Sequence, residues 1–236
     1  MWGQRQNLAF WDTSVGQKIL TLDFIFRKIS EAQRSFIEAA ARHDIHIACP
    51  SDCGSCCHGF MPDVLPVEAD YIAYYILRTN SGTSSKPGVI PEVPAALPTL
   101  ETWLSQKQPD NPSPCPFHDP FSPGANCRVY LARPLICRLF GYSSSRAKTG
   151  QTIFRLCRHM PTPEGFSART LDTKELNAAI GATPPLMSDF AMEILAIDPS
   201  SASERTQLSE AMPSAFARVS SMLRYCPDEP EPHAAA

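Results

Sequence analysis

The chain has 236 residues, of which 43% are hydrophobic and 19% are charged, and its formal net charge is -3 at pH 7. This composition is typical of a globular protein and excludes a disordered chain. The small negative charge argues against nucleic acid as a partner, because a general nucleic-acid binder normally carries a basic excess. No apolar run is long enough for a signal-peptide core or a membrane span, so we expect a cytoplasmic protein with no membrane partner.

The first expected element is a long amphipathic helix over residues 15–43. Ser14 followed by Gln17 predicts a capping box at its start. At ~1.5 Å per residue, such a helix would be about 43 Å long. We interpret it as a scaffold that covers the core. Apolar residues recur along it at the three- and four-residue steps of one helical face, namely Val15, Ile19, Leu22, Phe26, Ile29, Phe36 and Ala40.

The middle of the chain alternates between regular elements and irregular stretches. A second helix is expected over Pro66–Leu77, with proline at a favourable first position. Residues 80–98 are rich in Ser, Gly and Pro and predict a flexible loop. A short helix is expected at 99–108, and the alternation in QTIFRLC, residues 151–157, indicates one strand.

The last third predicts three helices, near residues 172–180, 184–196 and 203–224, with Pro213 interrupting or restarting the last one. Two pairs of residues resemble capping boxes at helix starts, Asp172 with Glu175 and Ser201 with Glu204.

These elements together predict a single compact domain that is mainly α with little β and has a small, irregular, cysteine-rich, metal-bound centre. We divide the chain into an N-terminal scaffold helix at 1–48, a cysteine-cluster metal-binding domain at 49–160, a helical extension at 161–226 and a disordered tail at 227–236.

Nine cysteines carry the main chemical signal. Four of them lie in CPSDCGSCC, at Cys49, Cys53, Cys56 and Cys57, and four more follow at Cys115, Cys127, Cys137 and Cys157. Cys226 stands apart, and we interpret it as a spare thiol. An odd number of cysteines in a cytoplasmic protein disfavours a disulfide framework and favours metal binding or redox chemistry.

Thiolate is a soft ligand that prefers zinc and iron–sulfur clusters to hard ions. Cys53 and Cys56 have the two-residue gap of a metal knuckle. The second group has gaps of 11, 9 and 19 residues, which disfavours a zinc ribbon with two knuckles. The proline-rich stretch PDNPSPCPFHDPFSPGANC, residues 109–127, can build little core itself. A thiolate-bound metal can supply about 10 kcal/mol of folding free energy.

Charged neighbours could tune such a site. Two or three arginines near the second group are expected to offset the negative charge of a thiolate centre, out of Arg128, Arg133, Arg138, Arg155 and Arg158. Three histidines next to cysteines remain alternative ligands: His58, His118 and His159.

The segments CPSDCGSCC, CPF and CRVYLARPLICRLF, together with Cys157, resemble the YkgJ-like CxxCxxCC cysteine-cluster family, which is described as zinc- or iron-chelating. Besides the cysteines, Tyr130, Arg133, Pro134 and Arg138 carry the likeness. The resemblance implies that the eight cysteines from Cys49 to Cys157 are the metal ligands. The first gap here is three residues instead of two, a departure from the family's pattern.

The leading hypothesis is a cytoplasmic metalloprotein that binds an iron–sulfur cluster, slightly preferred, or zinc. Two alternatives stay open. The first is an iron–sulfur-dependent enzyme. Cys49, Cys53 and Cys56 have the C-x3-C-x2-C spacing of radical S-adenosylmethionine enzymes, although the chain lacks the strand–helix alternation of the barrel of those enzymes. A weaker likeness, to flagellin lysine methylases, implies a methyl-transfer or redox enzyme with no assignable catalytic residue. The other alternative is a zinc-stabilised module that binds a protein partner.

Overall fold

A computed structural model describes residues 9–49, 53–57, 59–79, 101, 115–119, 127–162 and 169–226. The loop predicted at 80–98 and the tail predicted at 227–236 lie outside these residues. The helix predicted at 99–108 also lies outside them, apart from residue 101.

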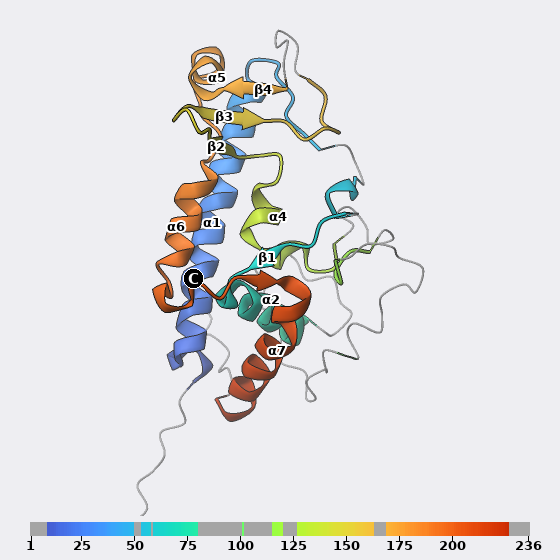
Figure 1. Ribbon diagram of the computed structural model, residues 1–236, viewed down its shortest axis with the longest axis vertical. Coiled ribbons are helices and arrows are strands. Elements are labelled where there is room, and N and C mark those ends of the chain that lie inside the picture. Colours follow the sequence, from blue (N-terminus) through green and yellow to red (C-terminus); the bar gives the residue numbers. More distant parts are fainter. Residues whose placement is uncertain are drawn as a thin grey trace, which may run out of the picture.

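The predicted long helix is confirmed as α1 (Ser14–Ala41), which runs along the molecule and carries the other elements on its flanks (Figure 1). Six of the seven apolar residues predicted on its inner face are buried, and Val15 packs against the core from a half-buried position. The predicted cap is off by one residue. Thr13, not Ser14, is the N-cap, and its hydroxyl accepts a hydrogen bond from the backbone N–H of Gly16 at 3.0 Å.

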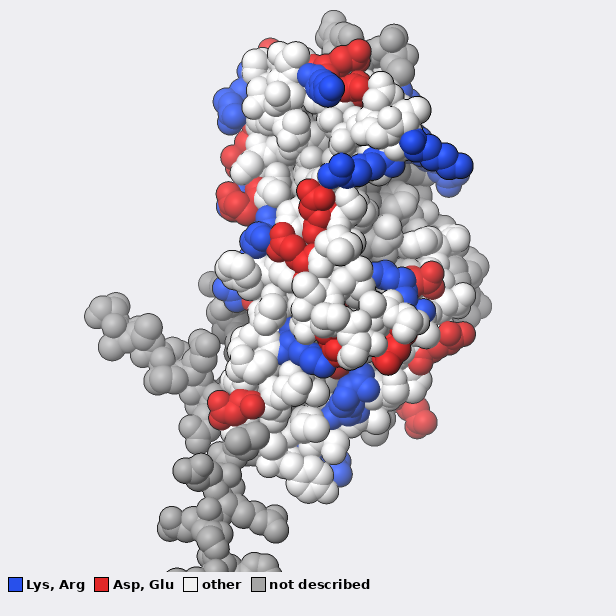
Figure 2. All heavy atoms as spheres, turned by 60° about the vertical axis from the view of Figure 1, so that its left-hand side comes forward, with Lys and Arg blue, Asp and Glu red and all other residues white. Residues whose placement is uncertain are grey.

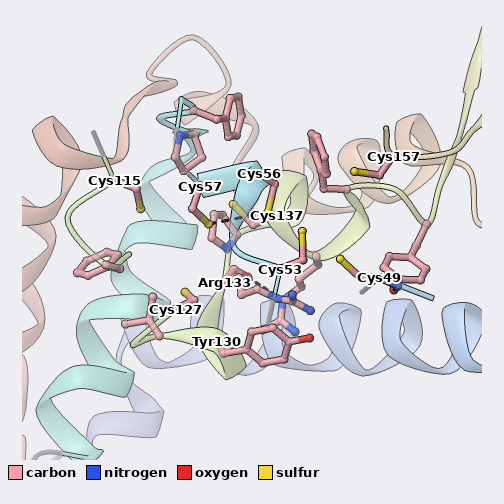
Figure 3. A pocket seen from close by; sticks show the side chains of 18 of the residues that line it. Cys49, Cys53, Cys56, Cys57, Cys115, Cys127, Tyr130, Arg133, Cys137 and Cys157 are labelled. Carbon is pink, nitrogen blue, oxygen red and sulfur yellow. Dashed lines mark hydrogen bonds between the residues drawn. The ribbon is translucent and has the colours of Figure 1, made fainter. Parts of the chain in front are cut away.

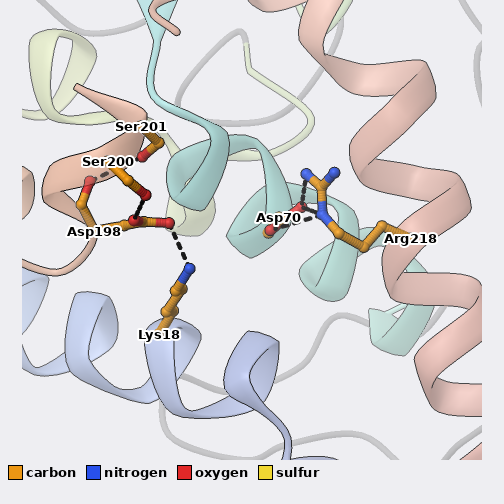
Figure 4. A network of polar contacts seen from close by, with 6 residues as sticks. All are labelled: Lys18, Asp70, Asp198, Ser200, Ser201 and Arg218. Atoms are coloured by element: carbon orange, nitrogen blue, oxygen red, sulfur yellow. Dashed lines mark hydrogen bonds and ion pairs between the residues drawn. The ribbon is translucent and has the colours of Figure 1, made fainter. Parts of the chain in front are cut away.

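The first of three hydrophobic clusters surrounds the N-terminal part of α1. The predicted second helix is confirmed as α2 (Pro66–Thr79), which packs against α7 (Leu208–Tyr225) and the 3-10 turn η1 (Phe10–Asp12). The guanidinium of Arg218 on α7 donates to the carboxylate of the buried Asp70 on α2, with a closest approach of 2.6 Å (Figure 4). This ion pair joins the two helices next to their apolar contact.

The second cluster lies at the middle of α1, where α4 (Leu135–Leu139) and α6 (Met187–Leu195) contact it. Two ion pairs flank this contact. Lys18 pairs with Asp198, which also accepts from Ser200 (Figure 4), and Lys28 pairs with Glu193 at 2.6 Å. The C-terminal segment therefore extends along α1 as a second layer.

The third cluster lies at the C-terminal end of α1. A three-stranded antiparallel sheet covers it in the order β2 (Ser144–Arg146), β3 (Thr152–Arg155), β4 (Thr170–Asp172). β3 confirms the predicted strand. The sheet leads into α5 (Thr173–Ile180), and Asp172 caps this helix as predicted by accepting from Lys174 N–H at 2.7 Å.

A second small sheet pairs β1 (Asp63–Val64) with β5 (Thr206–Gln207) and fixes where α7 begins. The prediction that Ser201 and Glu204 cap this helix is wrong, because Ser201 ends the 3-10 turn η4 (Pro199–Ser201) and α7 starts at Leu208. Pro213 lies inside α7 without breaking it. Burial of the α7 face against α2 offsets the lost hydrogen bond of this proline.

The fold prediction is confirmed in its coarse form, because the described residues are mainly helical with two small sheets. None of the described helices is long and apolar enough to cross a membrane. Over the face formed by α1 and α6, acidic and basic side chains are interspersed (Figure 2), in keeping with the small net charge.

Candidate metal centre

All eight cysteines predicted to be ligands line one pocket with a volume of about 330 Å³ (Figure 3). The rest of the pocket wall is mainly apolar and aromatic, and includes Phe60, Phe117, Tyr130, Phe140 and Tyr142. Its charged lining residues are Arg133 and Arg138. All nine cysteines lie within the described residues and none forms a disulfide. Cys226, at the end of α7, is not among the pocket-lining residues.

The first cysteine group is held by a 3-10 turn, η2 (Ser55–Cys57). The backbone N–H of Cys57 donates to the Gly54 carbonyl at 2.8 Å, which curls the chain so that Cys53, Cys56 and Cys57 all face the pocket. The sulfur atoms of Cys56 and Cys57 lie 3.9 Å apart, and the Cys53 thiol lies 3.5 Å from the Ser55 hydroxyl. The turn therefore concentrates thiols at one edge of the pocket.

The second group reaches the pocket from three separate segments. An antiparallel bridge between His118 and Cys127 brings the turn that holds the buried Cys115 beside Cys127. A hydrogen bond of 2.9 Å from Arg128 N–H to the Phe117 carbonyl fixes this pairing. Cys137 points into the pocket from α4, and Cys157 follows β3 at the other side (Figure 3).

Three residues that the sequence reasoning missed position the side of the pocket near Cys157. The hydroxyl of Tyr142 accepts a hydrogen bond from the Cys49 backbone N–H at 3.0 Å, which ties Cys49 to the segment just before β2. Arg169 donates to the carbonyls of Cys157 and Met160. Gly141 has φ +77, and a Cβ there would lie 3.3 Å from that of Cys157, so a larger residue would crowd the pocket wall.

Glu68, in the first turn of α2, is a further residue that the sequence reasoning missed. It is 2% exposed, and its two carboxylate oxygens accept from Leu65 N–H at 2.9 Å and Leu135 N–H at 2.8 Å. Burial raises the pKa of Glu68, and the two N–H donors oppose this rise. The carboxylate thus joins the start of α2 to the start of α4, the helix that carries Cys137.

The two arginines of the pocket have different surroundings. Arg138 donates to the carbonyls of Arg133 and Leu131 and lies over the Phe26 ring, 3.9 Å from its centroid, and burial lowers its pKa to about 10. It is therefore a structural residue. Arg133 stacks on Tyr130 at 3.7 Å from the ring centroid, and its buried Nε atom has no hydrogen-bond partner among the described residues.

The other candidate residues lie off the pocket wall. The half-buried Arg128 and the exposed Arg155 and Arg158 are not among the pocket-lining residues, so two of the five candidate arginines line the pocket. His118 is buried behind Cys115 and His159 is exposed; neither is among the pocket-lining residues, and His58 lies outside the described residues.

Crowding and burial set the acidity of the thiols. Burial, followed by the charge and hydrogen bond of Cys53, raises the pKa of Cys49 to about 11. Burial also raises the pKa of Cys127 to about 11 and that of Cys137 further. A hydrogen bond from Cys57 lowers the pKa of Cys56 to about 6, and the charge of Arg133 adds to this effect. Several thiolates can coexist in this pocket only when a cation neutralises them.

The donor set fits a soft metal in its chemistry, because eight thiols line a largely apolar pocket. In the described part of the chain, however, no three Cys, His, Asp or Glu side chains are arranged to hold one ion. A tetrahedral zinc with Zn–S bonds of about 2.3 Å needs sulfurs about 3.8 Å apart. The sulfurs of Cys56 and Cys57 lie near this distance, and those of the other pocket cysteines are spread around the cavity (Figure 3).

A mainly helical scaffold gathers cysteines from four segments around one pocket, and such a donor set is typical of the class of thiolate metal-binding proteins. The comparison with protein families agrees with this class. Residues 48–158 match the model of the family CxxCxxCC, described as "Putative zinc- or iron-chelating domain". The resemblance inferred from the cysteine spacing is thus confirmed at the level of the family. No curated protein and no solved structure matched the chain.

Proposed function

We propose that this protein binds iron as an iron–sulfur cluster through thiolates of the eight pocket cysteines, with zinc as the rival occupant. The observation that carries the proposal is the convergence of eight thiols from distant segments on one cavity. None of the eight forms a disulfide, which suits the reducing cytoplasm, where we expect the protein to act.

Two features favour a cluster over one zinc ion. The thiols are distributed around a cavity of about 330 Å³ instead of being gathered on a point. Arg133 also presents a guanidinium with an unpartnered Nε in the pocket wall. A cluster with four thiolates is negatively charged, and hydrogen bonds to its sulfurs stabilise it and set its reduction potential.

The identity of the metal is tested on protein purified without oxygen. We expect a brown protein with broad absorbance near ~400 nm and equal amounts of iron and acid-labile sulfide. A colourless protein that contains zinc, and that takes up no cluster after anaerobic reconstitution with iron and sulfide, would overturn the iron–sulfur proposal and leave zinc as the occupant. A protein that takes up neither metal would overturn metal chelation itself.

The ligand role of the first cysteine group is tested with Cys53→Ser and Cys56→Ser. We expect each substitution to lower the metal content per chain and the melting temperature together, because metal binding is coupled to folding. Cys226→Ser is the matched control, since this cysteine lies outside the pocket, and it should keep the full metal content. Full metal content in both Cys53→Ser and Cys56→Ser would contradict their role as ligands.

A further inference from the structure

The eight cysteines fall into two sets at opposite sides of the pocket. Figure 3 shows Cys115 and Cys127 at one side and Cys49 and Cys157 at the other, with Cys56 between them. The inner set is defined as Cys57, Cys115, Cys127 and Cys137, and the outer set as Cys49, Cys53, Cys56 and Cys157. The contiguous pair Cys56 and Cys57 lies at the boundary, with one residue in each set.

The two sets belong to different parts of the hydrophobic core. Cys115 and Cys127 are packed into the cluster formed by α2 and α7, whereas Cys157 packs against the cluster under the three-stranded sheet. Cys49 is tied to the same end of the molecule as Cys157 by the hydrogen bond from its N–H to Tyr142. The inner pair Cys115 and Cys127 and the outer pair Cys49 and Cys157 are therefore anchored by different parts of the core.

The sets also differ in access to solvent. In the inner set Cys115 is buried and the other three are half-buried, whereas in the outer set Cys49 and Cys56 are exposed and Cys53 and Cys157 are half-buried.

From this arrangement we infer that the pocket holds two metal centres: an inner, four-thiolate centre that stabilises the fold, and an outer, solvent-accessible centre that loads and unloads its metal. The inference rests on the proposed function. It explains why eight thiols are present when one zinc ion or one cluster takes four. A buried site with four protein ligands is typical of a structural centre, and an exposed site can exchange its metal with solution.

The inference is tested by metal analysis of two matched double variants. Cys49→Ser with Cys157→Ser should halve the metal content per chain and lower the melting temperature only slightly, since the inner centre stays loaded. Cys115→Ser with Cys137→Ser should also remove half of the metal and lower the melting temperature much more.

Release of metal from the unmodified protein provides a second measurement in case the inner variant fails to fold. With a water-soluble chelator such as EDTA, we expect two phases of equal amplitude, of which the fast phase is missing in the outer variant. A single phase, or loss of all metal in the outer variant, would overturn the two-centre inference while leaving metal chelation intact. Protein that holds no metal in any form would instead overturn the proposed function.

Discussion

Single side chains outside the cysteine set decide whether the pocket can form. Glu68 is buried and its carboxylate accepts from two backbone N–H groups, those of Leu65 and Leu135, which start α2 and α4. Both oxygens of a carboxylate accept hydrogen bonds, whereas an amide has one oxygen that accepts and one nitrogen that only donates. The position of α4, and with it Cys137, thus depends on the charge state and chemistry of one residue.

Glu68→Gln should lower the free energy of unfolding by about 1–3 kcal/mol, because the new amide group would face a backbone N–H and leave it unsatisfied. Chemical denaturation measures this difference. Glu175→Gln is the control, since Glu175 is an exposed residue in the first turn of α5 and should change stability little. Equal stability of the two variants would refute the anchoring role of Glu68.

Arg133 is the residue whose substitution should change the metal centre without removing a ligand. Its guanidinium lies in the pocket wall and its charge lowers the pKa of Cys56. Arg133→Gln should weaken metal retention about 10-fold or more, as is usual when a hydrogen-bonding neighbour of a metal ligand is lost. The rate of metal transfer to a chelator measures the effect.

Two further substitutions separate the causes. Arg133→Lys should restore part of the retention, since it keeps the charge but not the planar set of donors. Arg158→Gln, at an exposed position near Cys157, should behave as the unmodified protein does. If Arg158→Gln were as impaired as Arg133→Gln, the effect would be one of overall charge and not of Arg133.

At the scale of elements, the entry to α1 is more constrained than its periodicity indicates. Gly16 lies in the first turn, and a Cβ at this position would be 2.2 Å from the carbonyl oxygen of Phe10. The η1 turn folds back onto the helix here, and the Thr13 hydroxyl joins the two by accepting from Gly16 N–H and donating to the Phe10 carbonyl. The close approach therefore requires a residue without a side chain.

Gly16→Ala tests this contact by the sign of its effect. In an open helix, alanine in place of glycine is favourable by about 1 kcal/mol. Here we expect Gly16→Ala to destabilise the protein by about 1–3 kcal/mol, the usual cost of overpacking. Gly59→Ala is the control, because a Cβ there would meet nothing within 4 Å. A higher melting temperature for Gly16→Ala would show that η1 does not press on α1.

The helices with strong periodicity could be predicted from the sequence, and the details that depend on distant contacts could not. α1 and α2 were predicted to within about three residues, because their apolar spacing reports burial directly. Caps were less certain: Thr13 and Ser14 are both good N-cap residues, and Ser201 with Glu204 has the capping spacing in a turn that starts no α-helix.

The candidate ligands were predicted by residue type and spacing, whereas the residues that position them were not. Tyr142, Arg169 and Glu68 act on the pocket through backbone groups of distant residues, such as Cys49 N–H and Leu135 N–H. Such contacts leave no periodic or spacing signal in a single sequence. Every residue other than proline carries the same backbone N–H and C=O groups, and the fold alone determines which of them a distant side chain meets.

For the whole molecule, the pocket lies where the three hydrophobic clusters along α1 meet. Cys115 and Cys127 belong to the cluster of α2 and α7, and Cys157 packs on the cluster under the sheet. Cys137 lies in α4 between Leu135 and Leu139, two core residues of the second cluster. A group bound by these thiols would join three separately packed regions. It would thereby make the molecule unfold as one unit.

Removal of the metal should therefore lower both the stability and the cooperativity of the protein. Thiolate-bound structural metals contribute about 10 kcal/mol or more, and each 1 kcal/mol moves the melting temperature of a domain of this size by about 2–4 °C. We therefore expect a fall of at least about 20 °C. Calorimetry before and after chelation measures this fall, and a broader or split transition is expected in the metal-free protein.

Reloading with the same metal should restore the original transition, which separates metal loss from irreversible oxidation of the thiols. Coincident transitions in protein with and without metal would show that the clusters hold together through apolar contacts alone, and that the thiols of the pocket have no structural role.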